Sequence, residues 1–237
     1  METSHRHLIE TEGLTKTYED NGVEVPALQG IDLAIHAGEF TAIVGPSGSG
    51  KTTLLNIMSG LDKPSAGKVW LDGKPVSDMS GAELSDFRRD HIGFIFQAYN
   101  LIPVLKVGEN IEYIMLLQGV PREERHRRVH DILRDVDLEG YAHRFPNRLS
   151  GGQQQRVAIA RAMVSQPLMI LADEPTANLD SKTGADLVDM MRHLNEEHGM
   201  TFIFSTHDRL IVDKARRVIV IRDGLVASDE KRDEGPR

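Results

Sequence analysis

An apolar strand, a glycine-rich loop and a helix follow one another near the start of the chain, and their order restricts the fold more than any other feature. The run Phe40 to Val44 is apolar apart from Thr41, as expected of a strand buried on both faces. The residues that follow fit the pattern G-x-x-x-x-G-K-[ST], and a helical stretch from Thr53 to Met58 comes next. Such loops form where a parallel strand passes into a helix, so an α/β fold is expected. The loop consists of Gly45, Pro46, Ser47, Gly48, Ser49, Gly50, Lys51 and Thr52.

The loop carries the groups that bind a triphosphate. Successive backbone N–H groups can wrap a β-phosphate, and Lys51 can bridge the β- and γ-phosphate oxygens. The hydroxyl of Thr52 can ligate Mg²⁺, and Thr53 belongs to the same predicted site because it continues the helix. A plain glycine-rich turn is the alternative, but strand, loop and helix together argue against it. The sequence therefore predicts a site for a nucleoside triphosphate with Mg²⁺.

A second helix start has the features of an anion site. Within Leu149, Ser150, Gly151, Gly152 and Gln153, the serine and the glutamine have the spacing of a capping box. Capping does not explain the two glycines, because each costs about 1 kcal/mol relative to alanine inside a helix. Without Cβ atoms, the free N–H groups and the positive end of the helix dipole can approach an anion closely. On these residues alone, a capped helix and a phosphate site both stay open.

Two carboxylates follow a second buried strand. The apolar run Leu168 to Ala172 indicates a parallel strand and ends in Asp173 and Glu174. Strand ends of this kind face the ligand crevice of an open α/β sheet. Asp173 is placed to hold Mg²⁺ through its water shell, and Glu174 can accept a proton from the water that attacks the γ-phosphate. The alternative is a pair of solvated carboxylates before the Pro175 turn.

Together the three motifs resemble those of the nucleotide-binding subunit of an ATP-binding cassette (ABC) transporter, over residues from about 8 to 227. The resemblance implies that the chain binds and hydrolyses ATP with Mg²⁺. It implies that the residues from Leu149 to Gln153 bind the γ-phosphate of an ATP held by a second copy, so that two composite sites form per dimer. It also implies that Gln97 contacts Mg²⁺ and water and senses a membrane partner, and that His207 contacts the γ-phosphate.

Further positions follow from the same resemblance. Asn178, Leu179 and Asp180 resemble the D-loop, which crosses the dimer interface, and the same residues can cap the helix that follows. Tyr18 lies where the family places an aromatic ring that stacks on adenine. A plain edge-strand tyrosine is the alternative for that position.

One group within the family fits better than the others. The stretch from Arg88 to Gln97, followed by Asn100 to Pro103, resembles the lipoprotein-release and macrolide-efflux ATPases. Residues 175–180 fit this group too, with Ala177 where it commonly has glycine. Membership implies a separate membrane subunit that transmits motion across the membrane. A cell-division-type ABC ATPase, which regulates wall hydrolases without transport, and an importer ATPase are the alternatives.

The pattern along the chain predicts a single ABC ATPase domain over residues 1–227. Residues 1–97 and 167–227 are assigned to an α/β P-loop NTPase core with an antiparallel β subdomain. Residues 98–166 are assigned to an inserted α-helical subdomain, because helical patterns and charges replace strand signals there. The polar residues 228–237 are expected to form a disordered tail.

The composition of the chain restricts the kinds of partner that it is expected to bind. A net charge of −8 over 237 residues argues against broad contact with nucleic acid or anionic lipid, and the absence of cysteine excludes disulfides. No run approaches the roughly 20 apolar residues of a membrane span, and the first seven residues have no signal core. We therefore expect a peripheral subunit on the cytoplasmic face of the inner membrane. Its separate permease is expected to dock near the apolar stretch Gln97 to Leu105, for which ordinary packing is the alternative.

Overall fold

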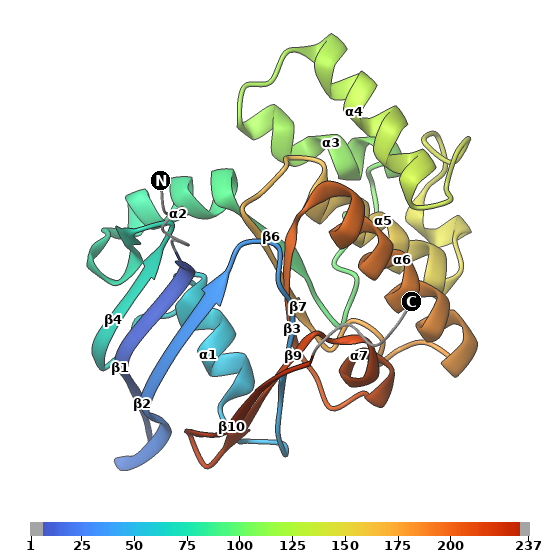
Figure 1. Cartoon of the computed structure of the whole chain (residues 1–237). Helices are drawn as coiled ribbons and strands as arrows, with labels where there is room; N and C mark the ends of the chain where they lie inside the picture. Colours follow the sequence, from blue (N-terminus) through green and yellow to red (C-terminus); the bar gives the residue numbers. More distant parts are fainter. Residues whose placement is uncertain (1–6, 233–237) are drawn as a thin grey trace, which may run out of the picture.

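The computed structural model describes residues 7–232 and arranges their strands in two sheets (Figure 1). The four-stranded sheet has the order β2-β1-β4-β5 and is antiparallel. The six-stranded sheet has the order β10-β9-β3-β8-β7-β6, and its pairs are parallel except for that of β10 with β9. The strands are β1 (His7–Asp20), β2 (Val23–His36), β3 (Phe40–Val44), β4 (Ala66–Leu71), β5 (Lys74–Pro75), β6 (Ile92–Ile95), β7 (Met169–Asp173), β8 (Thr201–Ser205), β9 (Arg217–Arg222) and β10 (Leu225–Lys231).

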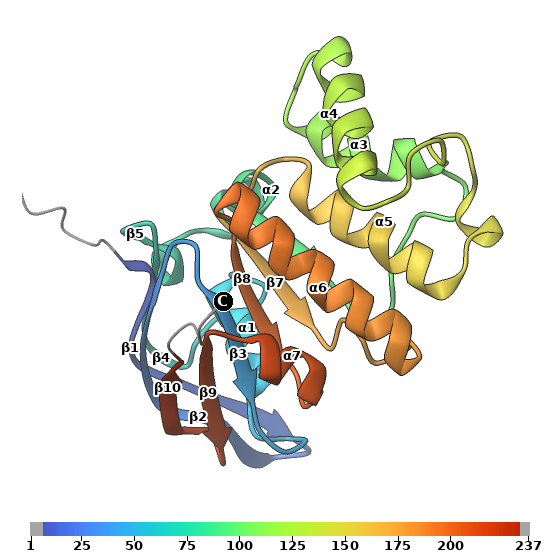
Figure 2. The same cartoon turned by 45° about the vertical axis from the view of Figure 1, so that its right-hand side comes forward.

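Five of the helices occupy three places around these sheets. Helix α1 lies between the two sheets (Figure 1), and α5 and α6 lie together across the other face of the six-stranded sheet (Figure 2). Helices α3 and α4 pack on α5 and project away from the sheets (Figure 2). The helices are α1 (Lys51–Met58), α2 (Gly81–His91), α3 (Val107–Leu117), α4 (Arg122–Asp135), α5 (Gly151–Met163), α6 (Ser181–His198) and α7 (Arg209–Lys214). Within residues 7–232, no helix combines the length and the apolar character that a membrane crossing needs.

Alternate side chains of the central strands supply two hydrophobic cores. On β8, Phe202 and Phe204 point to the face that α5 and α6 cover, whereas Ile203 points to the face that α1 covers. Strand β3 repeats this division, with Phe40 on the first face and Ile43 on the second. Because successive side chains of a strand point to opposite faces, a strand covered on both sides is mainly apolar. This explains the apolar runs that identified these strands.

Two segments differ from the sequence-based expectation. Helix α2 was not predicted, since only Leu84 and Phe87 among its residues are buried and the apolar periodicity is correspondingly weak. The predicted tail is wrong in its first part, because residues 228–231 lie in β10 and pair with β9. Arg232 follows the strand and its N–H donates to the Arg216 carbonyl at 2.7 Å, while residues 233–237 lie outside the described residues.

Arg217 explains why the polar strand β10 is ordered. Its guanidinium donates to Asp229 on β10 at 2.6 and 2.8 Å, to Glu39 before β3 at 3.0 Å, and to the Ala34 carbonyl on β2 at 2.7 Å. The arginine is only 6% exposed, so it connects the two sheets from a buried position. Its hydrogen bond holds the pKa of Asp229 below the ordinary range, although burial opposes this.

We expect Arg217→Met to lower the free energy of unfolding by about 3 kcal/mol, the lower end for removal of one partner of a buried ion pair. The lower end applies because the Asp229 side chain is 33% exposed. Urea denaturation followed by Trp70 fluorescence measures this. Arg192→Met is the matched control, since its partner Glu196 is 44% exposed and such a surface pair contributes about 0.5 kcal/mol.

The difference in the free energy of unfolding between Arg217→Met and the unchanged protein should also depend on pH. Because the folded pKa of Asp229 is depressed, its contribution is present above the unfolded pKa of an aspartate and is lost as the pH falls through the folded value. A loss below about 1 kcal/mol at neutral pH would show that the buried arginine is not a major link between the sheets.

Candidate ATP-binding site

The predicted phosphate loop lines a cavity at the carboxyl edge of the six-stranded sheet. Strands β3, β7 and β8 are parallel neighbours, so the residues that follow them meet at the same edge. The cavity has a volume of about 630 Å³. The loop residues that line it are Gly45, Pro46, Ser47, Gly48, Gly50, Lys51, Thr52 and Thr53. Gln97, Asp173, Glu174 and His207 line it from the other strands, whereas Ser49 is buried and does not.

The loop needs glycine at Gly45 and Gly50 for steric reasons. A Cβ at Gly45 would lie 2.1 Å from the Ile221 carbonyl oxygen, and one at Gly50 would lie 2.5 Å from that of Ala27. Gly50 also has a φ of +104°, which L side chains rarely adopt. Lys51 begins α1, and its ammonium donates to the carbonyls of Gly45 at 2.8 Å and Pro46 at 2.9 Å. The backbone and the ammonium are thus gathered around one small space.

Oxygen ligands suited to Mg²⁺ lie beside the loop. The Thr52 hydroxyl is 3.3 and 3.4 Å from the two carboxylate oxygens of Asp173. Gln97 lines the same cavity, and its backbone carbonyl accepts a hydrogen bond from the Asn178 side chain at 2.9 Å. Hard oxygen donors in small number, completed by water and phosphate oxygens, are the usual surroundings of Mg²⁺ in nucleotide sites. The donor set therefore fits this ion.

Glu174 is held by two neighbours in a strained backbone position. Its φ is +46°, which is uncommon for a residue other than glycine and frequent at functional sites. The carboxylate accepts a hydrogen bond from the Thr206 hydroxyl at 3.0 Å and pairs with Nδ1 of His207 at 2.6 Å. Glu174 is 18% exposed while His207 is 77% exposed, so the histidine approaches from the solvent side. Thr206 was not among the predicted residues, and its only sequence signal is a hydroxyl next to His207.

The second helix start is capped as predicted. The Ser150 hydroxyl accepts from the Gln153 N–H at 3.3 Å, and the Gln153 side chain accepts from the Ser150 N–H at 3.0 Å. Leu149 is buried beneath this turn, and none of the residues from Leu149 to Gln153 lines the cavity of its own chain. The capping box is therefore present, and this helix start does not contribute to the phosphate cavity of its own chain.

The two glycines of this turn also have a packing role that the sequence did not indicate. A Cβ at Gly151 would lie 2.8 Å from the Tyr99 hydroxyl oxygen, and one at Gly152 would lie 2.4 Å from a methyl carbon of Thr183. Side chains at these positions would push against the segment after Gln97 and against α6. Packing therefore gives a reason for glycine here that is independent of the predicted access for an anion.

The remaining predicted residues lie around the cavity. Asp180 caps α6 by accepting from the N–H groups of Lys182 and Thr183, each at 3.1 Å, while Asn178 reaches Gln97. Leu179 packs against the main core. Tyr18 is on β1 and is 39% exposed, and it does not line the cavity. The partner of Tyr18 in β2 is Val25. Ala27 lies two residues further along β2 and lines the cavity, so Tyr18 stands at the rim of the cavity.

Comparison with known proteins agrees with this geometry. A family profile described as ABC transporter matches residues 28–177. The chain belongs to the ABC transporter family. An uncharacterized ABC transporter ATP-binding protein of Thermotoga maritima is 46% identical over 227 residues, which cover 96% of this chain and 97% of that protein. The macrolide export ATP-binding/permease protein MacB of Azoarcus sp. is 45% identical over 222 residues, which cover 94% of this chain but only 34% of MacB.

Solved structures of ABC cassettes show the same fold. The dimeric structure of the ATP-binding cassette MJ0796, in a post-hydrolysis state with ADP and Pi, has a TM-score of 0.86 and 44% identity. The match covers 96% of this chain and 100% of that one. This ABC subunit thus has the α/β ABC ATPase fold with an ATP-binding site, and it is an ATPase of the lipoprotein-release and macrolide-export group.

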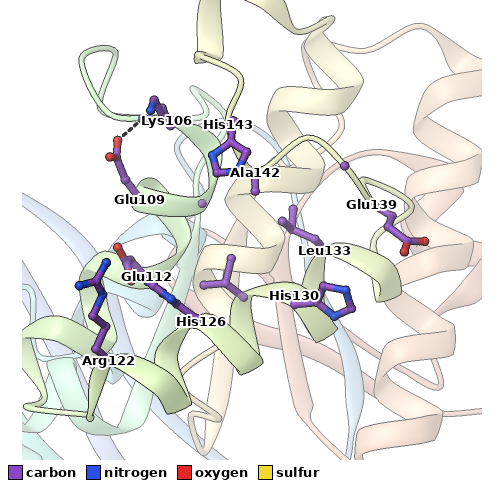
Figure 3. Close-up of a pocket in the computed structure, with 13 residues that line it drawn as sticks. Lys106, Glu109, Glu112, Arg122, His126, His130, Leu133, Glu139, Ala142 and His143 are labelled. Atoms are coloured by element: carbon purple, nitrogen blue, oxygen red, sulfur yellow. Dashed lines mark hydrogen bonds and ion pairs between the residues drawn. The ribbon is translucent and has the colours of Figure 1, made fainter.

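The ABC subunit has a second, larger cavity in its helical part. This cavity of about 690 Å³ lies between α3, α4 and the loop after α4 (Figure 3). Its histidines His126, His130 and His143 are spread along the cavity rather than gathered at one point (Figure 3). Within residues 7–232, no group of three or more His, Cys, Asp or Glu side chains is placed to hold a metal ion. Size alone therefore does not identify the chemical site, which is the smaller cavity at the sheet edge.

Proposed function

We propose that two copies of this ABC subunit bind two ATP molecules between them and drive a separate membrane permease of the lipoprotein-release and macrolide-efflux type. One observation carries the proposal: the helix start at Ser150 lies outside the phosphate cavity of its own chain. A glycine-bearing helix start that cannot reach its own ATP is suited to the ATP of another copy. The dimeric structures of related cassettes support this arrangement.

Within each site, the loop would hold the phosphates through its N–H groups and Lys51. Thr52, Asp173 and Gln97 would hold Mg²⁺, which neutralises charge on the phosphate oxygens. Glu174 would orient the attacking water and accept its proton, because its carboxylate is already fixed by Thr206. His207 would hold the other carboxylate oxygen and reach the γ-phosphate from the open side of the cavity.

The opposing copy would complete the site. Ser150 and the free N–H groups at Gly151 and Gly152 would contact the γ-phosphate, favoured by the positive end of the α5 dipole. Closure of the dimer would exclude water other than the attacking one, and loss of the bridging γ-phosphate would let the copies separate. Asn178 in the D-loop would connect this interface to Gln97, since the two residues are hydrogen-bonded.

An apolar surface next to Gln97 supports the membrane partner. Val104, in the segment after Gln97, is 78% exposed, and three apolar side chains of α3 are 43–52% exposed. One of the three, Tyr113, lines a cavity of about 300 Å³ together with Phe96 and Ile102. Exposed apolar patches beside a groove are typical of helix-docking sites, and a relative such as MacB is named as an ATP-binding/permease protein. The α3 residues are Tyr113, Leu116 and Leu117.

Val104→Asp should reduce recovery of the permease at least tenfold when the tagged subunit is purified from native membranes, because a carboxylate would be desolvated in the apolar contact. The ATPase rate of the isolated subunit should stay unchanged. Val23→Asp is the matched control, since Val23 is 63% exposed but lies on β2, and it should recover the permease normally. Equal recovery with Val104→Asp would reject this docking surface.

The topology of the recovered partner then separates the alternatives. A large extracytoplasmic domain supports the lipoprotein-release and macrolide-efflux type, with the subunit at the cytoplasmic face of the inner membrane. A small domain that binds a hydrolase activator would favour the cell-division type instead. An associated solute-binding protein would favour an importer.

A further inference from the structure

Three side chains at the rim of the ATP cavity form a closed cluster. The Tyr18 hydroxyl donates to one carboxylate oxygen of Asp62 at 2.8 Å, and the Lys16 ammonium donates to the other at 2.7 Å. Lys16 also lies over the Tyr18 ring, 4.8 Å from its centre. Each member thus contacts both of the others. The ring orientation of an otherwise exposed tyrosine is fixed by this cluster.

Asp62 connects the cluster to the phosphate loop. It follows α1, and its N–H donates to the Asn56 carbonyl of that helix at 3.1 Å. Helix α1 runs from Lys51 to Met58, so it carries the loop at its first residue, and a turn hydrogen-bonded back to Asn56 places Asp62 four residues after its last. The Asp62 side chain therefore sets the position of the Tyr18 ring relative to the loop. The β1–β2 pair has a register shift between Lys16 and Thr17, just before Tyr18, so the hydrogen bond to Asp62 adds a contact that the strand pairing does not supply.

Protonation and access are both suited to a stacking role. Burial raises the pKa of Tyr18, so its hydroxyl remains a donor at neutral pH. Burial would raise the pKa of Asp62 as well, but hydrogen bonds from Lys16 and Tyr18 lower it, so the acceptor is ionised. Lys16 lies over one face of the ring and is only 13% exposed, so a planar ligand would stack on the opposite face.

We propose that Asp62 is a positioning residue for nucleotide binding, which holds the Tyr18 ring at the distance from the phosphate loop where a base of the bound triphosphate stacks on it. Asp62 contacts the tyrosine and not the nucleotide. The inference rests on the proposed function, because it presumes that the loop holds the phosphates. A simple structural connection between β1 and the end of α1 is the competing explanation.

Two ligands distinguish these explanations: ATP, and inorganic tripolyphosphate, which has no base. Their dissociation constants are measured by calorimetry with Mg²⁺. Tyr18→Ala and Asp62→Ala should each weaken ATP binding about tenfold, as expected for loss of one base–aromatic stack, and should leave tripolyphosphate within about twofold. The double variant should be no weaker than either single one, because the residues act as a unit. Asp62→Asn keeps an acceptor for Tyr18 and should restore most of the ATP affinity.

Two controls keep the outcomes apart. Asp20→Ala removes a carboxylate two residues from Tyr18 on the same strand, but it does not touch the cluster, so both affinities should be unchanged. Lys51→Ala should weaken both ligands, and failure to do so would reject the proposed function rather than the role of Asp62. Equal losses for ATP and tripolyphosphate in Asp62→Ala, or a loss in Tyr18→Ala alone, would overturn the positioning role.

Discussion

Glu174→Gln should lower the ATPase turnover at least about 100-fold while the subunit still binds ATP. The amide has the shape of the carboxylate and can still accept the hydrogen bond from Thr206, but it cannot take the proton of the attacking water. ATP then remains between the two copies instead of being hydrolysed. Size-exclusion chromatography with ATP should therefore show a stable dimer, while the same variant without ATP elutes as a monomer.

A second substitution tests whether that dimer depends on the predicted interface. Adding Ser150→Arg to Glu174→Gln places a bulky cation at the helix start that faces the partner's ATP. The double variant should stay monomeric with ATP, although its own phosphate loop is intact. Persistent monomers of Glu174→Gln on ATP would contradict ATP-dependent dimerisation, and a turnover within threefold of the unchanged protein would remove Glu174 from the proton transfer.

Two inactive variants should regain activity when they are mixed. Lys51→Ala has a defective loop and an intact signature, whereas Ser150→Arg has the reverse. A mixed dimer then contains one site in which both halves are intact and one in which both are defective. With random pairing, about half of the dimers are mixed, and the phosphate release rate should reach about a quarter of that of the unchanged protein.

The matched control mixes two variants with defects on the same side. Lys51→Ala with Glu174→Gln leaves every site defective, so that mixture should stay inactive. Activity in the control mixture would show that pairing is not what restores turnover. An inactive mixture of Lys51→Ala with Ser150→Arg, despite mixed dimers on a column, would count against sites shared between copies.

The cavity could be predicted from the sequence because it depends on local order. Lys51, Asp173 and His207 each follow an apolar strand, and parallel strands bring their carboxyl ends to one edge. The motifs and their strands were therefore sufficient to predict which side chains meet. The ABC ATPase fold followed from the same motifs and agrees with the related structures.

Other contacts could not be predicted, because they join residues that are distant in the chain. The steric need for Gly152 comes from Thr183 on α6, and the order of β10 depends on the ion pair of Arg217 with Asp229. No local pattern encodes such pairs. Helix α2 was missed for a different reason: two buried side chains are too few to give a clear helical period.

The separation of Ser150 from the cavity of its own chain has a consequence for how the subunit behaves before assembly. Under the proposed shared-site arrangement, a solitary copy has the parts of two half-sites and no complete site, so it would bind nucleotide without hydrolysing it. At low abundance, the rate of hydrolysis would grow with the square of the subunit concentration rather than in proportion to it. Newly made subunits would thus hydrolyse little ATP until two of them meet. A permease that holds two of them side by side would then start ATP hydrolysis.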